Sequence, residues 1–396
     1  MLTPGHLLKF GSYITHHTFN PDAISLNVVQ NGSVINDSTF NSENIQAVEN
    51  YFYLEDEIRF NSRLKANAGL HFSTFHVRGR HYHSLQPRVS VSQMVAPNSS
   101  IKASFATMTQ YIHLLSNTGV GMPTDIWVPA TDKILPQQSW IASAGYFQNL
   151  YDGKFEFSTE VYYKEMNNVI EFTEGTDFLK NGPETKFIDE VNNNWEDRVA
   201  SGFGWTYGAE FFLRKKTGKA TGWVGYTLAW ANRQFDLIND GKPFPYIYDR
   251  RHDVSIVLNH QLSPKIKLGA VWVYNSGYRV TLPEGSYLPY YFDYGKTDSY
   301  INQQVVDYIS NRNNYQLPDY HRLDLSISFL KQKKISEREW NLALYNAYNR
   351  RNPFTVFVTG SNTNTNPSQS GSTQIRELHQ LTLFSIIPSI SYRYKF

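Results

Sequence analysis

The sequence predicts an all-β protein, an antiparallel transmembrane β-barrel of about fourteen strands. Apolar and polar residues alternate with a period of two over many consecutive segments, which is typical of strands with one apolar and one polar face. The connections between these segments alternate between short and long, as they do in transmembrane barrels. The last such segment runs to the final residue, with Ile390, Tyr392, Tyr394 and Phe396 on its apolar face.

Composition excludes several other classes. The 396 residues carry 37 Lys and Arg against 35 Asp and Glu, so the net charge of +2 lacks the basic excess typical of nucleic-acid-binding proteins. Without cysteine, the chain has no disulfide framework, zinc–thiolate site or cysteine nucleophile. No run of apolar residues approaches the length of a transmembrane helix. A mean hydropathy of −0.46 still fits a barrel, because only alternate residues face lipid.

Short polar turns join the predicted strands in pairs, and we expect no helix longer than three turns. The first strand is "HLLKFGSYITHHTF", in which Leu8, Phe10 and Ile14 alternate. Connections of a few residues are typical of β-hairpins. The predicted turns lie at 61–63, 97–99, Asp152-Gly153, 217–219, 263–265 and around 331–337.

Long connections separate these hairpins. A compact soluble domain rarely contains several loops of this length, whereas the outer loops of membrane barrels are long as a rule. This asymmetry favours a barrel over a soluble β-sandwich or propeller. The predicted long connections are 18–43, 113–136, 171–202, 280–319 and 359–377.

The alternation also predicts which way the side chains point. A slip of one residue would invert a whole strand, so this prediction tests the register. We expect Leu54, Leu70, Val89, Phe105, Val161, Ile256, Leu325 and Ile390 to point outward, and Glu57, Lys65, Arg88, Glu156, Glu210, Arg322 and Asp324 to point inward.

Several stretches together resemble the barrel of TonB-dependent outer-membrane receptors, of the type common in Bacteroidetes, which often carry an N-terminal carboxypeptidase-regulatory-like domain. They include "WNLALYNAYNRRNPF", the terminal "IIPSISYRYKF", and residues 85–131, 143–172 and 221–263. The resemblance extends from about Leu7 to Phe396. It implies a location in the outer membrane of a Gram-negative bacterium and active uptake of a ligand too large for porins.

Complete receptors of this family have a signal peptide, a TonB box, a plug domain and about 22 strands, the size of plugged transporters. "MLTPGHLLKFGSY" has no basic region followed by an apolar core, so it does not read as a signal peptide. We therefore expect residues 1–396 to be one barrel segment without plug, TonB box or signal peptide, and inactive in energised uptake by itself. We expect its sheet to stay open or to close only under strain.

The resemblance also implies partners. Barrels of this family end on an aromatic residue that the barrel-assembly machinery reads, so Tyr392, Tyr394 and Phe396 are the candidates for that signal. They are equally the lipid-facing end of a strand, and the two roles are compatible. The other expected partners are outer-membrane lipid and the TonB complex, the latter only through the missing plug.

No catalytic motif or cofactor site is evident, and we expect no enzyme activity and no cofactor. A glycosidase needs two carboxylates about 5 to 10 Å apart. Glu156 and Glu160 lie on one strand face with Cα atoms about 13 Å apart, which suits two charges lining a wet lumen. His81 and His83 are weak candidates for a metal site, and solvated loop histidines are the alternative.

Candidate ligand contacts lie in the long connections. In "KPFPYIYDRRHD", Tyr246, Tyr248, Arg250 and Arg251 could hold an anionic ligand through forked hydrogen bonds. The alternative is an Asp–Arg lattice that fixes the loop to the barrel wall. Trp127 is a further candidate ligand contact. Tyr290 and Tyr291 could stack on a sugar or an aromatic siderophore, or could instead pack within their own loop or belong to the outer aromatic girdle.

Two classes of function remain open besides a distant third. The first is the barrel of a TonB-dependent transporter. The second is a passive fourteen-stranded pore, which requires the strand at Leu8 to pair with the strand at Phe396. The third is a soluble carbohydrate-binding β-protein. The identity of the ligand is not evident from the sequence.

Overall fold

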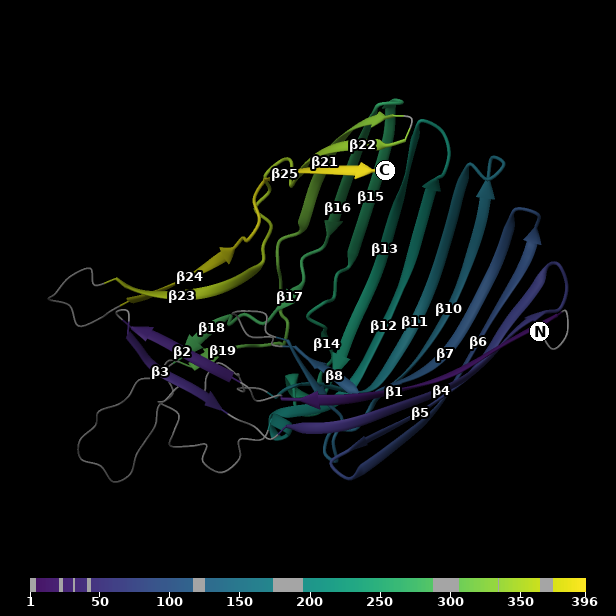
Figure 1. The fold of residues 1–396 in the computed structure, drawn as a ribbon. Coiled ribbons are helices and arrows are strands. Elements are labelled where there is room, and N and C mark those ends of the chain that lie inside the picture. The colour runs from purple at the N-terminus through teal and green to yellow at the C-terminus, as the bar shows by residue number, and fades with distance from the viewer. Residues whose placement is uncertain are drawn as a thin grey trace, which may run out of the picture.

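The computed structural model describes residues 5–20, 24–30, 33–40, 44–116, 125–173, 195–287, 306–333, 335–363 and 373–396. Its main feature is one antiparallel sheet of 15 strands, of which all but β14 follow one another in chain order (Figure 1). That path is β1 (His6–Phe19), β4 (Ile45–Arg59), β5 (Leu64–Val77), β6 (Arg80–Ala96), β7 (Ser99–Gln110), β10 (Gln137–Leu150), β11 (Phe155–Phe172), β12 (Val199–Lys215), β13 (Ala220–Gln234), β15 (His252–Ser263), β16 (Ile266–Asn275), β21 (Tyr320–Gln332), β22 (Glu337–Tyr345) and β25 (Ile387–Lys395). The predicted all-β fold and strand number are therefore confirmed.

Helices are scarce in the described part of the chain. They are two short 3₁₀ turns, η3 (Trp195–Arg198) and η4 (Asn239–Gly241). No described helix is long and apolar enough to cross a membrane.

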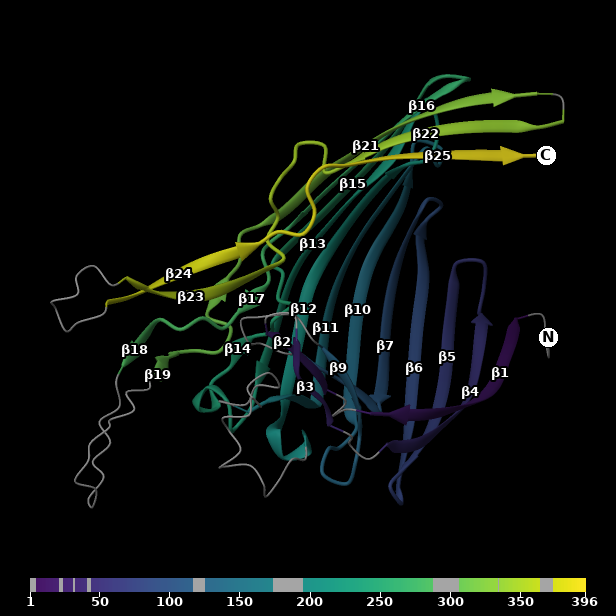
Figure 2. The same ribbon diagram turned by 60° about the vertical axis from the view of Figure 1, so that its left-hand side comes forward.

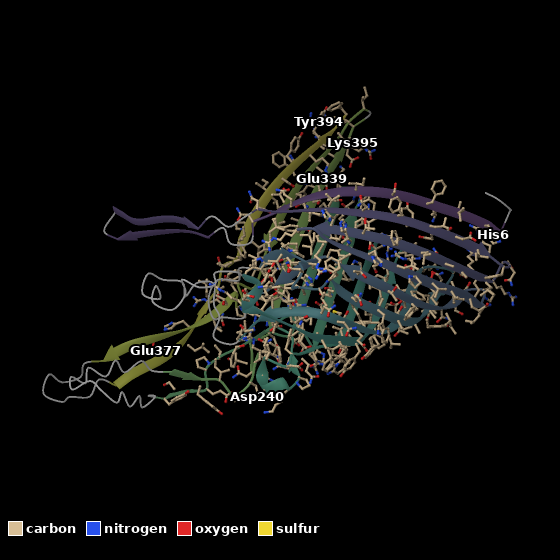
Figure 3. All side chains as sticks on the ribbon, turned by 90° about the horizontal axis from the view of Figure 1, so that it is seen from below. His6, Asp240, Glu339, Glu377, Tyr394 and Lys395 are labelled. Carbon is tan, nitrogen blue, oxygen red and sulfur yellow. The ribbon has the colours of Figure 1, made fainter. Side chains whose placement is uncertain are left out.

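The sheet bends strongly but its two edges do not meet. Figures 1 and 2 show a trough-shaped wall with β1 along one edge and β25 along the other. In Figure 3, His6 of β1 lies far from Tyr394 and Lys395 of β25. β1 pairs only with β4, and β25 only with β22, so the expected open sheet is confirmed for these strands.

All of the predicted short turns lie at one end of the sheet, and positive φ angles mark several of them. Asp152 and Gly153 have φ of 55° and 78°, and Gly218 has φ of 101°. At the other end of the sheet one connection is equally short, and this turn was not predicted. There Arg78 and Gly79, with φ of 44° and 76°, join β5 to β6 in a two-residue turn of the kind that suits twisted hairpins.

The long connections contain short hairpins of their own. Figures 1 and 2 show several of them extending beyond the wall. The connection between β22 and β25 is wider than predicted, because its hairpin spans 355–381. The pairs are β2 (Ile24–Gln30) with β3 (Ser33–Phe40), β8 (Ile112–Leu115) with β9 (Ile126–Pro129), β17 (Arg279–Val280) with β20 (Tyr315–Gln316), β18 (Gly285–Tyr287) with β19 (Val306–Tyr308), and β23 (Thr355–Thr363) with β24 (Thr373–Leu381), while β14 (Phe244–Pro245) pairs with β13.

The strand register confirms both predicted sets of side chains. Directly paired residues of neighbouring strands share a face. Leu54 pairs with Leu70, and Val89 pairs with Phe105. Following such pairs from strand to strand shows that these residues share one face of the sheet with Ile390. All the residues predicted to point outward lie on this face, and all those predicted to point inward lie on the other.

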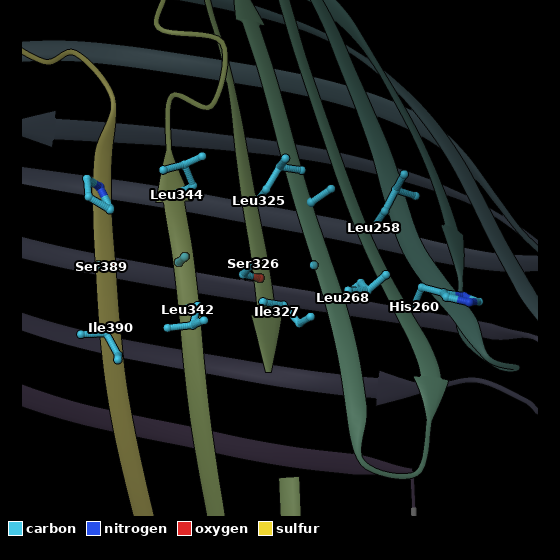
Figure 4. A pocket seen from close by; sticks show the side chains of 14 residues that line it. Leu258, His260, Leu268, Leu325, Ser326, Ile327, Leu342, Leu344, Ser389 and Ile390 are labelled. Atoms are coloured by element: carbon cyan, nitrogen blue, oxygen red, sulfur yellow. The ribbon is translucent and has the colours of Figure 1, made fainter. Parts of the chain in front are cut away.

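The two faces have different surroundings. The segment after β7 covers part of the inner face, where the Tyr111 ring stacks on Phe75 at 4.9 Å and its hydroxyl lies 2.8 Å from the Ser73 hydroxyl. No segment among the described residues covers Ile390 on the outer face, where its side chain is 65% exposed. An apolar groove of about 940 Å³ lies on this face, which suits contact with lipid. Figure 4 shows the side chains that line it. Its apolar lining includes Leu258, Leu268, Leu325, Ile327, Leu342, Leu344 and Ile390.

A single-layered wall has no central core, and buried apolar residues gather where the long connections begin. One cluster is Leu115, Val128, Ile134, Ile170, Phe172 and Trp195, and others centre on Phe75, Phe235 and Leu317. This end of the wall is therefore packed in three dimensions, and it is the end that can hold side chains in fixed positions.

Candidate functional site

The connection between β13 and β15 places Asp249 in a buried polar cluster on the packed end. Its backbone N–H donates to the Tyr246 carbonyl at 2.8 Å, which forms a turn. Its carboxylate is 3% exposed and accepts from the Ala231 backbone N–H at 2.9 Å and from Arg251 at 3.2 Å. Arg279 lies 4.0 Å away. The carboxylate thus ties the connection to the neighbouring strand β13 and to β17.

Arg251 takes part in this framework. Its guanidinium lies 4.6 Å from the Trp230 ring centroid, in a cation–π arrangement, while also pairing with Asp249. These contacts favour the Asp–Arg lattice that fixes the loop to the wall. Arg250, which lies between Asp249 and Arg251 in the sequence, is exposed. A direct role of either arginine in ligand binding stays a prediction.

Tyr246 and Tyr248 meet edge to face, with ring centroids 5.4 Å apart. The Arg233 guanidinium lies 3.6 Å from the Tyr246 ring, and the Tyr248 hydroxyl donates to Asp125 at 2.6 Å. Burial, and then the hydrogen bond to the Asp125 carboxylate, raise the pKa of Tyr248 well above its usual range. Tyr248 therefore stays a hydrogen-bond donor at physiological pH.

Asp125 brings Trp127 into the same neighbourhood. The two residues are two positions apart at β9, so they point to one side of that strand. Trp127 is 58% exposed, whereas Val128, the next residue of β9, is buried. The structure thus joins Tyr248 to Asp125, two residues before Trp127, through a contact that sequence spacing could not reveal.

A second buried ion cluster was not predicted. Glu171, at the end of β11, is 1% exposed and lies 3.1 Å from Arg233 and 3.7 Å from Arg312. Because Glu171 lies in β11, Arg233 in β13 and Arg312 in a distant connection, no local pattern signals the cluster. Arg233 links it to the Tyr246 ring, so the two clusters form one continuous polar patch.

The remaining predicted residues lie elsewhere. Tyr290 and Tyr291 fall outside the described residues. His81 contacts His76 across the β5–β6 turn, at 3.1 Å between Nδ1 atoms. No group of three or more His, Asp or Glu side chains that could hold a metal occurs in the part of the chain that the structure describes.

The predicted terminal aromatics lie on β25. Tyr392 packs against Trp340 with ring centroids 4.7 Å apart, and Tyr394 lies 5.3 Å from the Arg338 guanidinium. Phe396 is 94% exposed. All three follow Ile390 on the outer face by alternation, as a lipid-facing strand end requires.

His113 in β8 provides a pH-dependence test of this packed end. Burial lowers the pKa of His113 to about 4, against a smaller opposing effect of the Leu135 backbone. Since the unfolded chain binds the proton more readily, stability should fall as pH drops below about 6.5 and level off below about 4. We expect a loss of about 2 kcal/mol at pH 5 relative to pH 8 from this group.

The measurement is urea unfolding of the chain in lipid vesicles at both pH values, for the wild type and for His113→Gln. Glutamine keeps a polar side chain of similar size but does not titrate. The wild-type loss should exceed that of the variant by the expected amount. Equal losses in the two proteins would show that His113 is not held neutral by burial.

Comparisons with known proteins match the chain over most of its length. A family model described as "TonB dependent receptor-like, beta-barrel" matches residues 4–372. The ferric-catecholate import receptor Fiu from E. coli K12 superposes with a TM-score of 0.60 at 12% identity, over 99% of this chain and 52% of that one. The FrpB iron transporter from Neisseria meningitidis (F5-1 variant) gives 0.55 at 13% identity, over 100% and 54%.

The ferripyoverdine receptor of Pseudomonas aeruginosa, bound to ferripyoverdine, gives a TM-score of 0.56 at 12% identity, over 87% of this chain and 42% of that one. The chain thus spans about half the length of these structures. At such identities the likeness concerns the fold alone. The curated proteins include no match to this sequence.

Proposed function

The chain belongs to the TonB-dependent receptor β-barrel family, and we propose that it forms fourteen strands of a larger receptor that imports a ligand too large for porins. Members of this family lie in the outer membrane of Gram-negative bacteria. The observation that carries the proposal is the open sheet. The free edges of β1 and β25 hold backbone groups that lipid cannot satisfy, so the wall needs further strands, about 22 in all.

The open sheet and the exposed apolar face argue against the two alternatives. A passive fourteen-stranded pore requires β1 and β25 to pair with each other. Among the described residues, β1 pairs only with β4, and β25 only with β22. A soluble carbohydrate-binding protein would not expose an apolar face across the whole sheet. We propose a transport role, without enzyme activity, for the complete protein.

The proposed partners follow from this role. Outer-membrane lipid would cover the apolar outer face, and the barrel-assembly machinery would read Tyr392, Tyr394 and Phe396. Energy would come from the TonB complex through a plug domain that residues 1–396 do not supply. In this proposal residues 1–396 form a barrel segment only.

The test is uptake by cells with and without the gene that encodes this chain. Ferric siderophores, cobalamin, peptides and glycans are supplied one at a time as the required nutrient. Growth on one of them should depend on both this gene and an intact TonB complex. Uptake that persists without TonB would favour a passive pore and contradict the proposal.

For the ligand site, we propose that Trp127, Tyr246, Tyr248, Arg250 and Arg251 face the imported ligand, together with Tyr290 and Tyr291. The exposed Trp127 and Arg250 are the best probes, because Asp249 does not hold their side chains in the lattice. We expect Trp127→Ala and Arg250→Ala each to lower the affinity for the nutrient identified above at least about tenfold, or about 1.4 kcal/mol.

The matched control is Arg393→Ala, which removes an exposed arginine at the opposite end of the wall. It should leave the affinity unchanged, and none of the three variants should alter unfolding in urea. Unchanged affinity in both Trp127→Ala and Arg250→Ala would remove these residues from the proposed site.

A further inference from the structure

The turn between β5 and β6 brings two histidines together. His76 in β5 and His81 in β6 are direct cross-strand partners. Their rings stack with centroids 4.1 Å apart, and their Nδ1 atoms lie 3.1 Å apart. The two-residue turn at Arg78 and Gly79 fixes this register, so the pair is held by the hairpin and does not depend on a long loop.

The pair lies on the outer face, at the rim of the wall. His76 is on the same face as Leu70, and His81 on the same face as Val89, by the alternation of each strand. His83 is the next residue on that face, before the exposed Leu85 begins the apolar band. Both rings of the pair are exposed to solvent, so an ion can reach them.

We propose that His76 and His81 together bind one divalent transition-metal ion such as Cu²⁺, Zn²⁺ or Ni²⁺, with water in the other coordination positions. Imidazole nitrogen suits these metals. With metal–nitrogen bonds of about 2.0–2.1 Å, two nitrogens 3.1 Å apart subtend an angle of about 100° at the ion, between square-planar and tetrahedral values.

Two adjustments accompany binding. Each ring tilts about its Cβ–Cγ bond so that its nitrogen lone pair points at the shared ion, and the exposed setting leaves room for this. The His76 Nδ1 also lies 3.1 Å from the Arg80 carbonyl, which can only accept, so this nitrogen carries a hydrogen in the metal-free state. Coordination through it requires the other neutral tautomer: this hydrogen leaves Nδ1 for solvent as the metal–nitrogen bond forms, and solvent supplies one to Nε2, so the step releases no net proton.

The two ligands differ from the pair His81 and His83 suggested by sequence spacing. Cross-strand partners sit closer than residues two apart along one strand, whose Cα atoms are about 6.8 Å apart. The cross-strand pairing of His76 with His81 can be derived from the sequence only when the position of the turn between them is known. The site is separate from the proposed ligand site, since it is built on β5 and β6 and shares no residue with the connection between β13 and β15.

The test is titration of Cu²⁺ into the full 396-residue chain in detergent micelles, followed by calorimetry and electron paramagnetic resonance. The wild type should bind one ion with a spectrum showing two nitrogen ligands. His76→Ala and His81→Ala should each weaken that binding at least about tenfold and remove the two-nitrogen signature. The double variant should bind no more weakly than either single variant, because either change already destroys the chelate.

His260→Ala is the matched control, because His260 is an exposed histidine of the outer face on β15 without a histidine partner there. It should keep both the affinity and the signature. Two results would overturn the proposal: unchanged two-nitrogen binding in either single variant, or independent losses that add in the double variant. Both substituted side chains are exposed, and strand content measured by circular dichroism verifies that each variant is folded.

Discussion

Replacing Asp249 with alanine is expected to destabilise the folded chain by roughly 3–5 kcal/mol, the cost of removing one partner from a buried ion pair. The substitution leaves Arg251 and Arg279 without their carboxylate and the Ala231 N–H without its acceptor. Urea unfolding in lipid vesicles measures the loss. Proteolysis within 246–251 should also become faster, because the connection loses its attachment to β13.

Lys242→Ala provides the control, since this side chain is 68% exposed and its ammonium group lies 3.6 Å from the Asp240 carboxylate. An exposed pair of this kind contributes little to stability, so no measurable change is expected. Asp249→Asn should fall between the two, because the amide oxygen can still accept from Ala231. Equal stability of Asp249→Ala and Lys242→Ala would contradict the role of Asp249 as the anchor.

Placing a charge on the outer face should have the second largest effect. Val161 lies within β11, 54% exposed, between Ala144 and Ala209 of the neighbouring strands. Val161→Arg should destabilise the chain in vesicles by about 2–4 kcal/mol, the cost of an arginine near the bilayer midplane. Urea unfolding again provides the measurement.

The neighbouring residue supplies a control in the same strand. Glu160 faces inward, opposite Glu210 of β12, so Glu160→Arg places the same charge on the wet side next to a carboxylate. Its stability should remain within about 1 kcal/mol of the wild type. If Glu160→Arg proved as damaging as Val161→Arg, the assignment of the two faces would be wrong.

The fold could be predicted from sequence because alternation is a local property. Each strand carries its own period-two signal, and the register then carried the outward face from Leu54 to Ile390 without a slip. The short turns, apart from the turn at Arg78 and Gly79, were equally readable from their own residues. The hairpins inside the long connections were missed because the polar residues of these stretches were interpreted as loops.

The candidate site was predictable only in part. "YIYDRRHD" marked an unusual concentration of Tyr, Asp and Arg, but its partners Asp125, Arg233 and Arg279 come from other parts of the chain. Such contacts depend on the three-dimensional path of the chain, which no spacing rule gives. His76 was missed as the partner of His81 for the same reason. The Bacteroidetes type of receptor stays a prediction from the resemblance.

Disulfide trapping across the two sheet edges tests the central claim most directly, and the absence of native cysteine makes the readout clean. Ala343→Cys with Ser389→Cys joins paired positions of β22 and β25 and should cross-link. A cysteine scan of β1 from Ser12 to His16 against Ser391→Cys in β25 should give no cross-link within one folded chain. Efficient trapping between β1 and β25 would mean a closed fourteen-stranded ring, and would contradict the account of this chain as part of a larger receptor barrel.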